Sequence, residues 1–406
     1  MWAYSLRDRI TGFGPVDRGS NPRRLVRKRE VIKIKLGTKK YLTASSILIG
    51  TCIGAGVLGI PFVAAQSGFL VTLLYIFFVG GIIFFVNLFL GEVILRTKGD
   101  HQLIGYAKKY LGKDWKHIME FAVIFQVYAA LIAYMIGVGR SLSFLFFGNF
   151  AYELVFGIFF GLVMAGLLKG GISSLKKFEK LGVLIIISLL VFIFAWFVKD
   201  VSFYNLQGIN FQHIFLPFGV VLFALMSFHA VPEVKLVLKR HEHLFRKVLI
   251  TGTVVSIIFY SLFTFVVVGS MGSETPEVAT LALGSIFVVL GIFTMFTSFL
   301  SNGNALRENF QFDERFNKFW SWVFASLVPV GLFVLVELTD FFSFTRILGL
   351  GGVVSGGIIA LLILKMIRKA KIKGNRKPEY VTNANWWVLG TLAVIFLFGV
   401  LRELVI

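Results

Sequence analysis

Long runs of hydrophobic residues, separated by short polar or charged breaks, follow one another along the chain from residue 41 to residue 404. About 20 consecutive apolar residues in a helix cross the ~30 Å hydrocarbon core of a membrane. The runs therefore predict an all-α membrane protein with eleven transmembrane helices. We place these helices at residues 41–63, 69–95, 117–147, 150–168, 174–198, 213–238, 246–270, 284–304, 319–338, 341–367 and 386–404.

The first hydrophobic run is interrupted by four glycines and a proline between Gly50 and Pro61. Relative to alanine, glycine costs about 1 kcal/mol and proline about 3 kcal/mol in a helix interior. In hydrocarbon the freed backbone groups also need partners within the protein. We therefore predict an unwound hinge at residues 54–56 (Gly-Ala-Gly), whose amides and carbonyls bind a small polar substrate. The alternative is close helix packing, because Gly50 and Gly54 form a GxxxG pair.

A second irregularity lies in the run at 213–238, where Pro232 follows a histidine and precedes a glutamate. Proline removes a helical hydrogen bond and clashes with the carbonyl four residues earlier, so we expect a break near Phe228. The two broken helices are five apart, and because successive spans alternate in direction, they run oppositely. This spacing predicts an inverted repeat of five plus five helices. The predicted segments are a tail at 1–40, repeats at 41–200 and 201–370, and a loop with helix eleven at 371–406.

The composition and the placement of charge support a membrane protein with a defined orientation. Of the 406 residues, 57% are hydrophobic and 15% are charged, whereas soluble proteins carry about 25% charged residues. The net charge of +20 does not indicate a nucleic-acid partner, because 37 of the 41 Lys and Arg residues lie in alternate connecting segments. By the positive-inside rule, these segments are cytoplasmic. The N-terminus is then predicted inside and the C-terminus outside. The basic segments are 1–40, 96–116, 169–180, 235–247, 305–318 and 365–377.

Backbone groups at the two predicted breaks are the main candidates for substrate binding. Amides at the start of a half-helix would bind a carboxylate, and carbonyls freed by the second break would bind an ammonium group. Tyr128 would cap the site with its hydroxyl, and Phe228 would cover it, although both are equally consistent with ordinary core packing. The candidate backbone positions are Gly54, Ala55, Gly56, Val57, Phe228, His229 and Ala230.

Ionisable residues within the predicted spans are candidates for coupling transport to protons. His229 has an ordinary pKa of about 6.5 and suits a proton carrier, and Glu233 lies one turn further on. Lys180 lies one to two turns inside the fifth span, where burial would let it change charge. The alternatives are a neutral structural histidine and a lysine that extends to the membrane surface.

A sodium site is the competing hypothesis for coupling. The hydroxyls of Thr297 and Ser298 lie at the depth of the first break and would form an oxygen site with the carbonyls of Gly50 and Ile53. Hydroxyls that bond back to their own helix are the common alternative. The predicted spans contain no paired carboxylates, phosphate-binding loop or cluster of metal ligands, so we expect no enzyme activity and no cofactor other than a coupling ion.

The sequence at the first break resembles a known superfamily. The segment from Ile49 to Pro61, followed by Ala64-Ala65 and Gly68-Phe69, is similar to helix one of the amino acid–polyamine–organocation (APC) superfamily. The greatest similarity is to the branch of aromatic amino acid permeases and amino acid–auxin permeases. The run Thr297-Ser-Phe-Leu300 and the pair Phe228-His229 are similar to helices eight and six of the aromatic permeases.

This resemblance implies the leucine-transporter-like fold and secondary transport of an amino acid by alternating access in the plasma membrane. It also places Lys180 where sodium-coupled relatives hold their ion, which favours proton coupling. The substrate is then expected to be a hydrophobic or aromatic L-amino acid, because His229 and Glu233 are the only ionisable residues expected in the pocket. A sodium-coupled symporter and a non-transporting amino acid sensor are the alternatives. Membrane lipid is the other expected partner, and the oligomeric state is left open.

Overall fold

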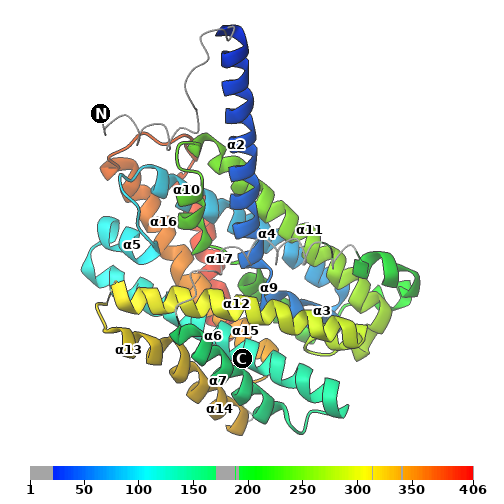
Figure 1. Cartoon of the computed structure of the whole chain (residues 1–406). Coiled ribbons are helices and arrows are strands. Elements are labelled where there is room, and N and C mark those ends of the chain that lie inside the picture. The colour runs from blue at the N-terminus through cyan, green and yellow to red at the C-terminus, as the bar shows by residue number, and fades with distance from the viewer. Residues whose placement is uncertain (1–21, 171–187, 189–191, 313, 340–341, 406) are drawn as a thin grey trace. The chain divides into compact units, whose positions relative to one another are not determined.

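The computed structural model describes residues 22–170, 188, 192–312, 314–339 and 342–405. The chain divides into a short N-terminal unit that ends at Leu42 and a large unit from Thr43 to Ile406, and the description below concerns the large unit. Every regular element in the described part of that unit is helical (Figure 1). The all-α fold class predicted from the sequence is therefore correct.

Helices lie where the hydrophobic runs predicted them. Seven helical stretches in the described residues are long and apolar enough to cross a membrane, or eight if the bent pair α2 (Pro22–Cys52) and α3 (Ala55–Ser67) is one span. Eleven spans therefore remain a prediction, and most of the fifth, at 174–198, lies outside the described residues. The continuous helices are α4 (Phe69–Leu95), α6 (Lys113–Phe147), α7 (Glu153–Lys169), α11 (Phe245–Met271), α12 (Ser285–Phe312) and α17 (Trp386–Val405).

Two further spans each contain a turn of π-helix. The first consists of α13 (Lys318–Trp322), the π-turn η7 (Val323–Leu327) and α14 (Val328–Thr339). The second consists of α15 (Phe344–Leu350), the π-turn η8 (Gly351–Ser355) and α16 (Gly356–Lys373). Such turns insert an extra residue into a helix and are frequent near functional sites. Here η8 packs against both α6 and α9 (Leu216–Leu225), two helices that line the site described below.

Helix packing separates a buried interior from a surface suited to lipid. The first broken helix continues as α3, which packs against α9 and α11, and α6 packs against α7 and α12 (Figure 1). One side of α4 is buried, while Leu70, Leu74, Phe77 and Phe85 on its other side are at least half exposed. A row of large exposed apolar side chains on a helix of membrane length is expected where the helix faces hydrocarbon.

A short amphipathic helix, α5 (Leu103–Leu111), follows α4. Its apolar face is buried, including Leu103, Tyr106 and Tyr110, and it packs against α6 and α16. This face therefore contacts protein.

Candidate functional site

The first broken helix is interrupted at Ile53 and Gly54, between the end of α2 and the start of α3. The two helical axes differ in direction by 49°. We predicted an unwound segment at residues 54–56, but Gly56 already lies within α3. A Cβ atom on Gly56 would lie 2.5 Å from Cα and 2.7 Å from Cβ of Ala224 in α9. Gly56 therefore allows close helix packing, while Gly54 lies in the break itself.

The second broken helix is interrupted at residues 226–229, between α9 and α10 (Ala230–Val237). The predicted break at Phe228 is present. We expected Pro232 to cause the break, but Pro232 lies in the first turn of α10. A first-turn amide has no partner within its helix, so proline there does not disrupt it. The break thus lies entirely before the proline.

Tyr260 of α11 connects the two interruptions. Its hydroxyl lies 2.6 Å from the carbonyl oxygen of Cys52, the last residue of α2, and 2.8 Å from that of Ala224, near the end of α9. Tyr260 is fully buried. Carbonyls at a helix C-terminus have no partner within the helix, so this phenol stabilises the ends of both half-helices. Sequence analysis did not identify this residue.

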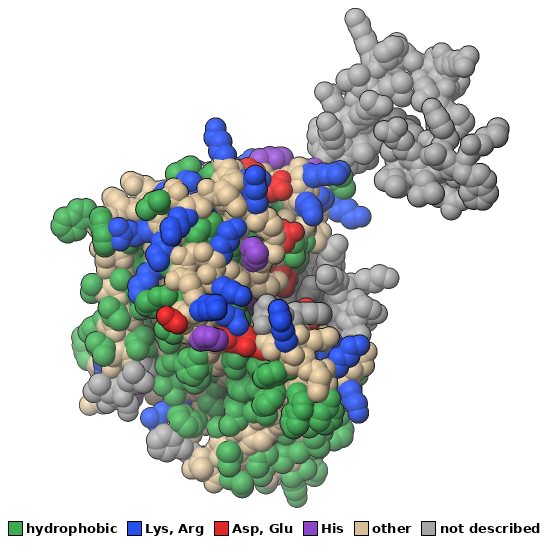
Figure 2. All heavy atoms as spheres, turned by 90° about the vertical axis from the view of Figure 1, so that its left-hand side faces the viewer, with side chains coloured by type: hydrophobic (Ala, Val, Ile, Leu, Met, Phe, Trp, Pro, Cys, Tyr) green, Lys and Arg blue, Asp and Glu red, His purple; other side chains and the backbone are tan. Residues whose placement is uncertain are grey.

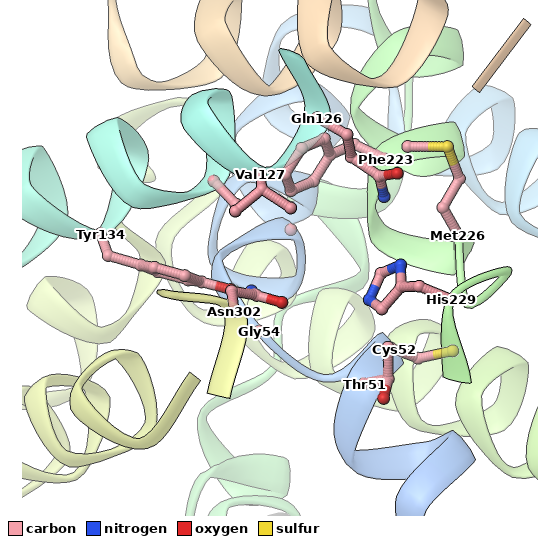
Figure 3. Close-up of a pocket in the computed structure, with 12 residues that line it drawn as sticks. Thr51, Cys52, Gly54, Gln126, Val127, Tyr134, Phe223, Met226, His229 and Asn302 are labelled. Carbon is pink, nitrogen blue, oxygen red and sulfur yellow. The ribbon is translucent and has the colours of Figure 1, made fainter. Parts of the chain in front are cut away.

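A cavity lies between the two breaks (Figure 3). Its volume is about 30 Å³, well below the roughly 300–1,000 Å³ typical of small-molecule sites. The imidazole of His229 points towards the middle of the cavity, with Gln126 on one side and Thr51 and Cys52 on another (Figure 3). The lining residues are Thr51, Cys52, Gly54, Gly56, Gln126, Val127, Ala130, Tyr134, Phe223, Met226, His229 and Asn302.

A second, larger cavity of about 250 Å³ shares Val127, His229 and Asn302 with the first. It also contacts Glu233 of α10 and extends to Leu103 and Ile104 of α5. Polar side chains line much of the remainder, including Gln102, Glu308 and Asn309. The second cavity is therefore adjacent to the central cavity and lies towards the end of the molecule that carries α5.

The structure brings some of the predicted substrate-binding residues to the cavity and separates others from it. Gly54, Gly56 and His229 line it, and Ala55 is the first residue of α3. Val57, Phe228 and Ala230 are buried near the breaks without lining the cavity. The hydroxyl of Tyr128 donates a hydrogen bond of 2.7 Å to the carbonyl of Phe324. This arrangement corresponds to a core tyrosine rather than to a cap over the substrate.

The predicted ion-coupling residues are only partly assembled. Ser298 faces the first break, since its hydroxyl would lie 3.8 Å from a Cβ atom on Gly54. The hydroxyl of Thr297 instead donates to the carbonyls of Phe293 and Thr294 in its own helix, which is the alternative considered above. Gly50 lies in the last turn of α2 and Ile53 is buried in the break. Lys180 lies outside the described residues.

Two polar residues that the sequence analysis did not consider line the cavity. Gln126 and Asn302 belong to α6 and α12, and the amide of Asn302 donates to the hydroxyl of Tyr134 at 3.2 Å. A polar side chain within an otherwise apolar span is costly in hydrocarbon. The position of Gln126 and Asn302 in apolar spans could therefore have identified them as candidate site residues. The sequence analysis considered the ionisable residues of the spans and not these uncharged amides.

An ion-pair network lies further along α6, on the side of the cavity away from α5. Arg140 contacts Glu153 of α7, with 3.0 Å between Nε and Oε2, and also Glu277. Glu277 accepts a hydrogen bond of 2.7 Å from the hydroxyl of Thr345 in α15. We call these four residues the Arg140 network. Three features therefore follow one another along α6. Val123 lines the second cavity, Tyr134 lines the central cavity, and Arg140 belongs to the Arg140 network.

Known proteins resemble this chain over most of its length. The model of the tryptophan/tyrosine permease family matches residues 37–282. Glutamine transporter 2 of Aliivibrio fischeri is 24% identical, over 89% of this chain and 98% of its own. Tyrosine-specific transport system 1 of Haemophilus influenzae is 23% identical, over 89% of this chain and 95% of its own. The crystal structure of MhsT in complex with L-phenylalanine superposes with a TM-score of 0.66 at 13% identity, over 90% of this chain and 98% of its own.

Proposed function

This chain belongs to the tryptophan/tyrosine permease family, and from that premise we propose that it is a proton-coupled symporter of hydrophobic or aromatic L-amino acids that works by alternating access. Its relatives are transport proteins, so the expectation that it is not an enzyme is confirmed. Amino acid transport agrees with the names of both relatives, a glutamine transporter and a tyrosine-specific transport system. The coupling ion and the side-chain preference are our inference.

The observation that carries this proposal is the meeting of two broken helices at one cavity. The positive N-terminal end of α3 and the negative C-terminal ends of α2 and α9 all lie at this cavity. Helix N-termini favour anions and helix C-termini favour cations. The amides of Ala55 and Gly56 would bind the substrate carboxylate, and the carbonyls at the end of α9 would bind its ammonium group. A backbone site of this kind suits any α-amino acid.

The substrate side chain would then lie among Val127, Phe223, Met226 and Gln126. The first three favour an apolar or aromatic group. Gln126 and Asn302 offer amides that would also pair with a polar, uncharged side chain such as that of glutamine. This second candidate is worth testing directly, because one relative is a glutamine transporter.

Binding and transport assays together test the proposed function. Purified protein is first screened for thermal stabilisation by each of the twenty amino acids, since a ligand that binds the native state raises its stability. Uptake and counterflow of the stabilising amino acids are then measured in proteoliposomes. Binding without counterflow would indicate a sensor. Stabilisation by no amino acid, together with no uptake, would refute the proposal.

Lys180 gives the first specific prediction, which follows from the sequence alone. We expect Lys180→Met to abolish uptake driven by a pH gradient while preserving exchange of labelled for unlabelled substrate, because only the charge-switching group is lost. Lys177→Met is the control, since Lys177 is predicted to extend to the membrane surface. Replacing sodium by choline should leave uptake unchanged. Uptake that requires sodium and ignores the pH gradient would instead support the sodium-coupled alternative.

The positions of the cavities and charges support an orientation. Figure 2 looks onto the side of the molecule where α5 lies in Figure 1, and Lys and Arg side chains gather over its upper and middle parts, while its lower part is mostly hydrophobic. The positive-inside rule makes the basic part cytoplasmic. The second cavity would then connect the central cavity to the cytoplasm, and the Arg140 network would close the external side.

The Arg140 network gives the second prediction. We expect Glu277→Gln to increase the rate at which a membrane-impermeant thiol reagent, added outside, modifies Cys52 several-fold. Glu277 links Arg140 to Thr345, so its neutralisation weakens the external closure, and Cys52 lines the central cavity. Glu274→Gln is the matched control, because no ion pair of Glu274 occurs among the described residues. Equal rates in both variants and the wild type would argue against this role.

The same variant has a defined pH dependence. Burial alone would raise the pKa of Glu277, but the hydrogen bond from Thr345 and the charge of Arg140 together hold this pKa below its ordinary value. Because the pKa is lowered in the folded protein, the network is intact above the ordinary pKa and is lost as the pH falls through the lowered one. The ratio of Cys52 modification rates in Glu277→Gln and the wild type should therefore stay constant between about pH 5.5 and 7.5. A ratio that falls within this range would contradict the assignment.

A further inference from the structure

A groove runs beside the contact between α16 and α17 and is also lined by Leu111 of α5 and by Trp115 and Ile118 of α6. Its volume is about 1,180 Å³, far larger than that of the central cavity. One part of its wall is apolar and includes Ile118, Leu361, Leu389 and Leu397. Ile118 and Leu397 are 41% and 49% exposed. The groove is therefore open along an apolar surface that suits an acyl chain.

The other part of the groove is basic and aromatic. Lys365 Nζ lies 3.6 Å from the ring centre of Trp115, and Arg368 Cζ lies 3.6 Å from that of Trp386. Lys369 lines the same part. These cation–π contacts fix the two cations in place without neutralising them.

No carboxylate balances these three cations within the described part of the chain. The residues that line the groove include neither aspartate nor glutamate. Nearby Lys371 differs, because its Nζ lies 3.3 Å from Glu92 Oε1. Lys365, Arg368 and Lys369 form no such ion pair with the described residues. The groove thus presents uncompensated positive charge at one end of an apolar surface.

The position of the basic end matches a lipid headgroup region. Lys365, Arg368 and Lys369 belong to the 365–377 segment, which the charge pattern places on the cytoplasmic side. Trp386 is 69% exposed, and tryptophan is enriched where membrane meets water. Basic pockets between transmembrane helices on this side bind the headgroups of anionic lipids.

We propose that this groove is a binding site for an anionic phospholipid. The phosphate binds Lys365, Arg368 and Lys369 between the rings of Trp115 and Trp386, and an acyl chain lies along Ile118, Leu361 and Leu397. The positive charge of the basic end favours an anionic lipid as the occupant. A zwitterionic lipid would bring its own cation against the basic end, and a second copy of the chain in the same orientation would bring the same positive charge.

The charge of the site is tested with purified full-length protein in detergent, titrated with dioleoylphosphatidylglycerol or dioleoylphosphatidylcholine. Bound lipid is counted by native mass spectrometry. We expect the wild type to retain phosphatidylglycerol preferentially and K365Q/R368Q/K369Q to bind it about tenfold more weakly, equivalent to about 1.4 kcal/mol. The control is K108Q/K109Q/K247Q, which removes three exposed charges that do not line the groove. An equal loss of phosphatidylglycerol binding in both variants would show that binding depends only on general surface charge, and it would overturn the proposal.

The shape of the site is tested without changing charge. Gly390 lines the groove, and a Cβ atom there would meet open space. We expect Gly390→Leu to fold normally and to reduce retention of phosphatidylglycerol at least fivefold, because the side chain occupies the acyl path. Gly331→Leu is the matched control, since its Cβ would also meet nothing within 4 Å and it lies in α14. Undiminished retention in Gly390→Leu, or equal retention of both lipids by the wild type, would overturn the proposal.

Discussion

Gly56→Val is expected to reduce amino acid uptake by at least tenfold and to lower the thermal stability of the purified protein. The glycine lies where α3 and α9 approach most closely, and a Cβ atom would lie 2.5 Å from Cα, 2.7 Å from Cβ and 3.0 Å from N of Ala224. Two of these atoms belong to the backbone, which cannot move aside as a flexible side chain can. Overpacking in a well-packed interior costs about 1–3 kcal/mol.

The loss of function should exceed the loss of stability. Separating α3 from α9 also moves Gly54 and the amides that follow it away from the cavity. Gly166→Val in α7 is the matched control, because a Cβ atom there would have no neighbour within 4 Å. Uptake at the wild-type level in Gly56→Val would show that the packing of α3 against α9 is not tight in the working protein.

Tyr260→Phe is expected to raise the KM for amino acid uptake several-fold and to lower thermal stability. The substitution keeps the ring and removes only the hydroxyl near the carbonyls of Cys52 and Ala224. A buried polar group that loses its partner costs about 1–3 kcal/mol. The freed helix ends would then be less rigidly positioned around the substrate.

Tyr380→Phe separates this effect from a general loss of stability. The hydroxyl of Tyr380 also donates to a carbonyl, that of Leu88 at 2.8 Å, but it lies outside the residues that line the central cavity. We expect this control to lower stability with little change in KM. Equal changes in KM for both variants would argue against a specific role for Tyr260.

Local sequence features predicted the helices and both breaks well. The run at 69–95 corresponds to α4, and the run at 246–270 differs from α11 by one residue at each end. Helix length in a membrane protein depends on hydrophobic runs, which are visible in the sequence. The breaks were also predictable, because glycine, proline and ionisable residues are costly in apolar spans and are visible in the sequence.

Contacts between distant segments were not predictable. The sequence does not show that Gly56 meets Ala224, which is why its role was assigned to unwinding instead of packing. It also does not show that Tyr260, one tyrosine in an unbroken helix, reaches the ends of two others. Tyr128 is a further example, because the sequence does not show that its hydroxyl donates to the carbonyl of Phe324. Such contacts depend on how helices pack in three dimensions.

The bond between Tyr260 and both helix ends restricts how the cavity can change its access. Cys52 of α2 and Ala224 of α9 cannot separate without breaking a buried hydrogen bond, and the contact at Gly56 joins α3 to the same residue of α9. Motions that preserve both contacts must carry α9, α3 and the end of α2 together as a single body. Exchange between the two sides of the membrane would then come from α6 and α12 shifting past this body, so that transport depends on sliding at one internal boundary.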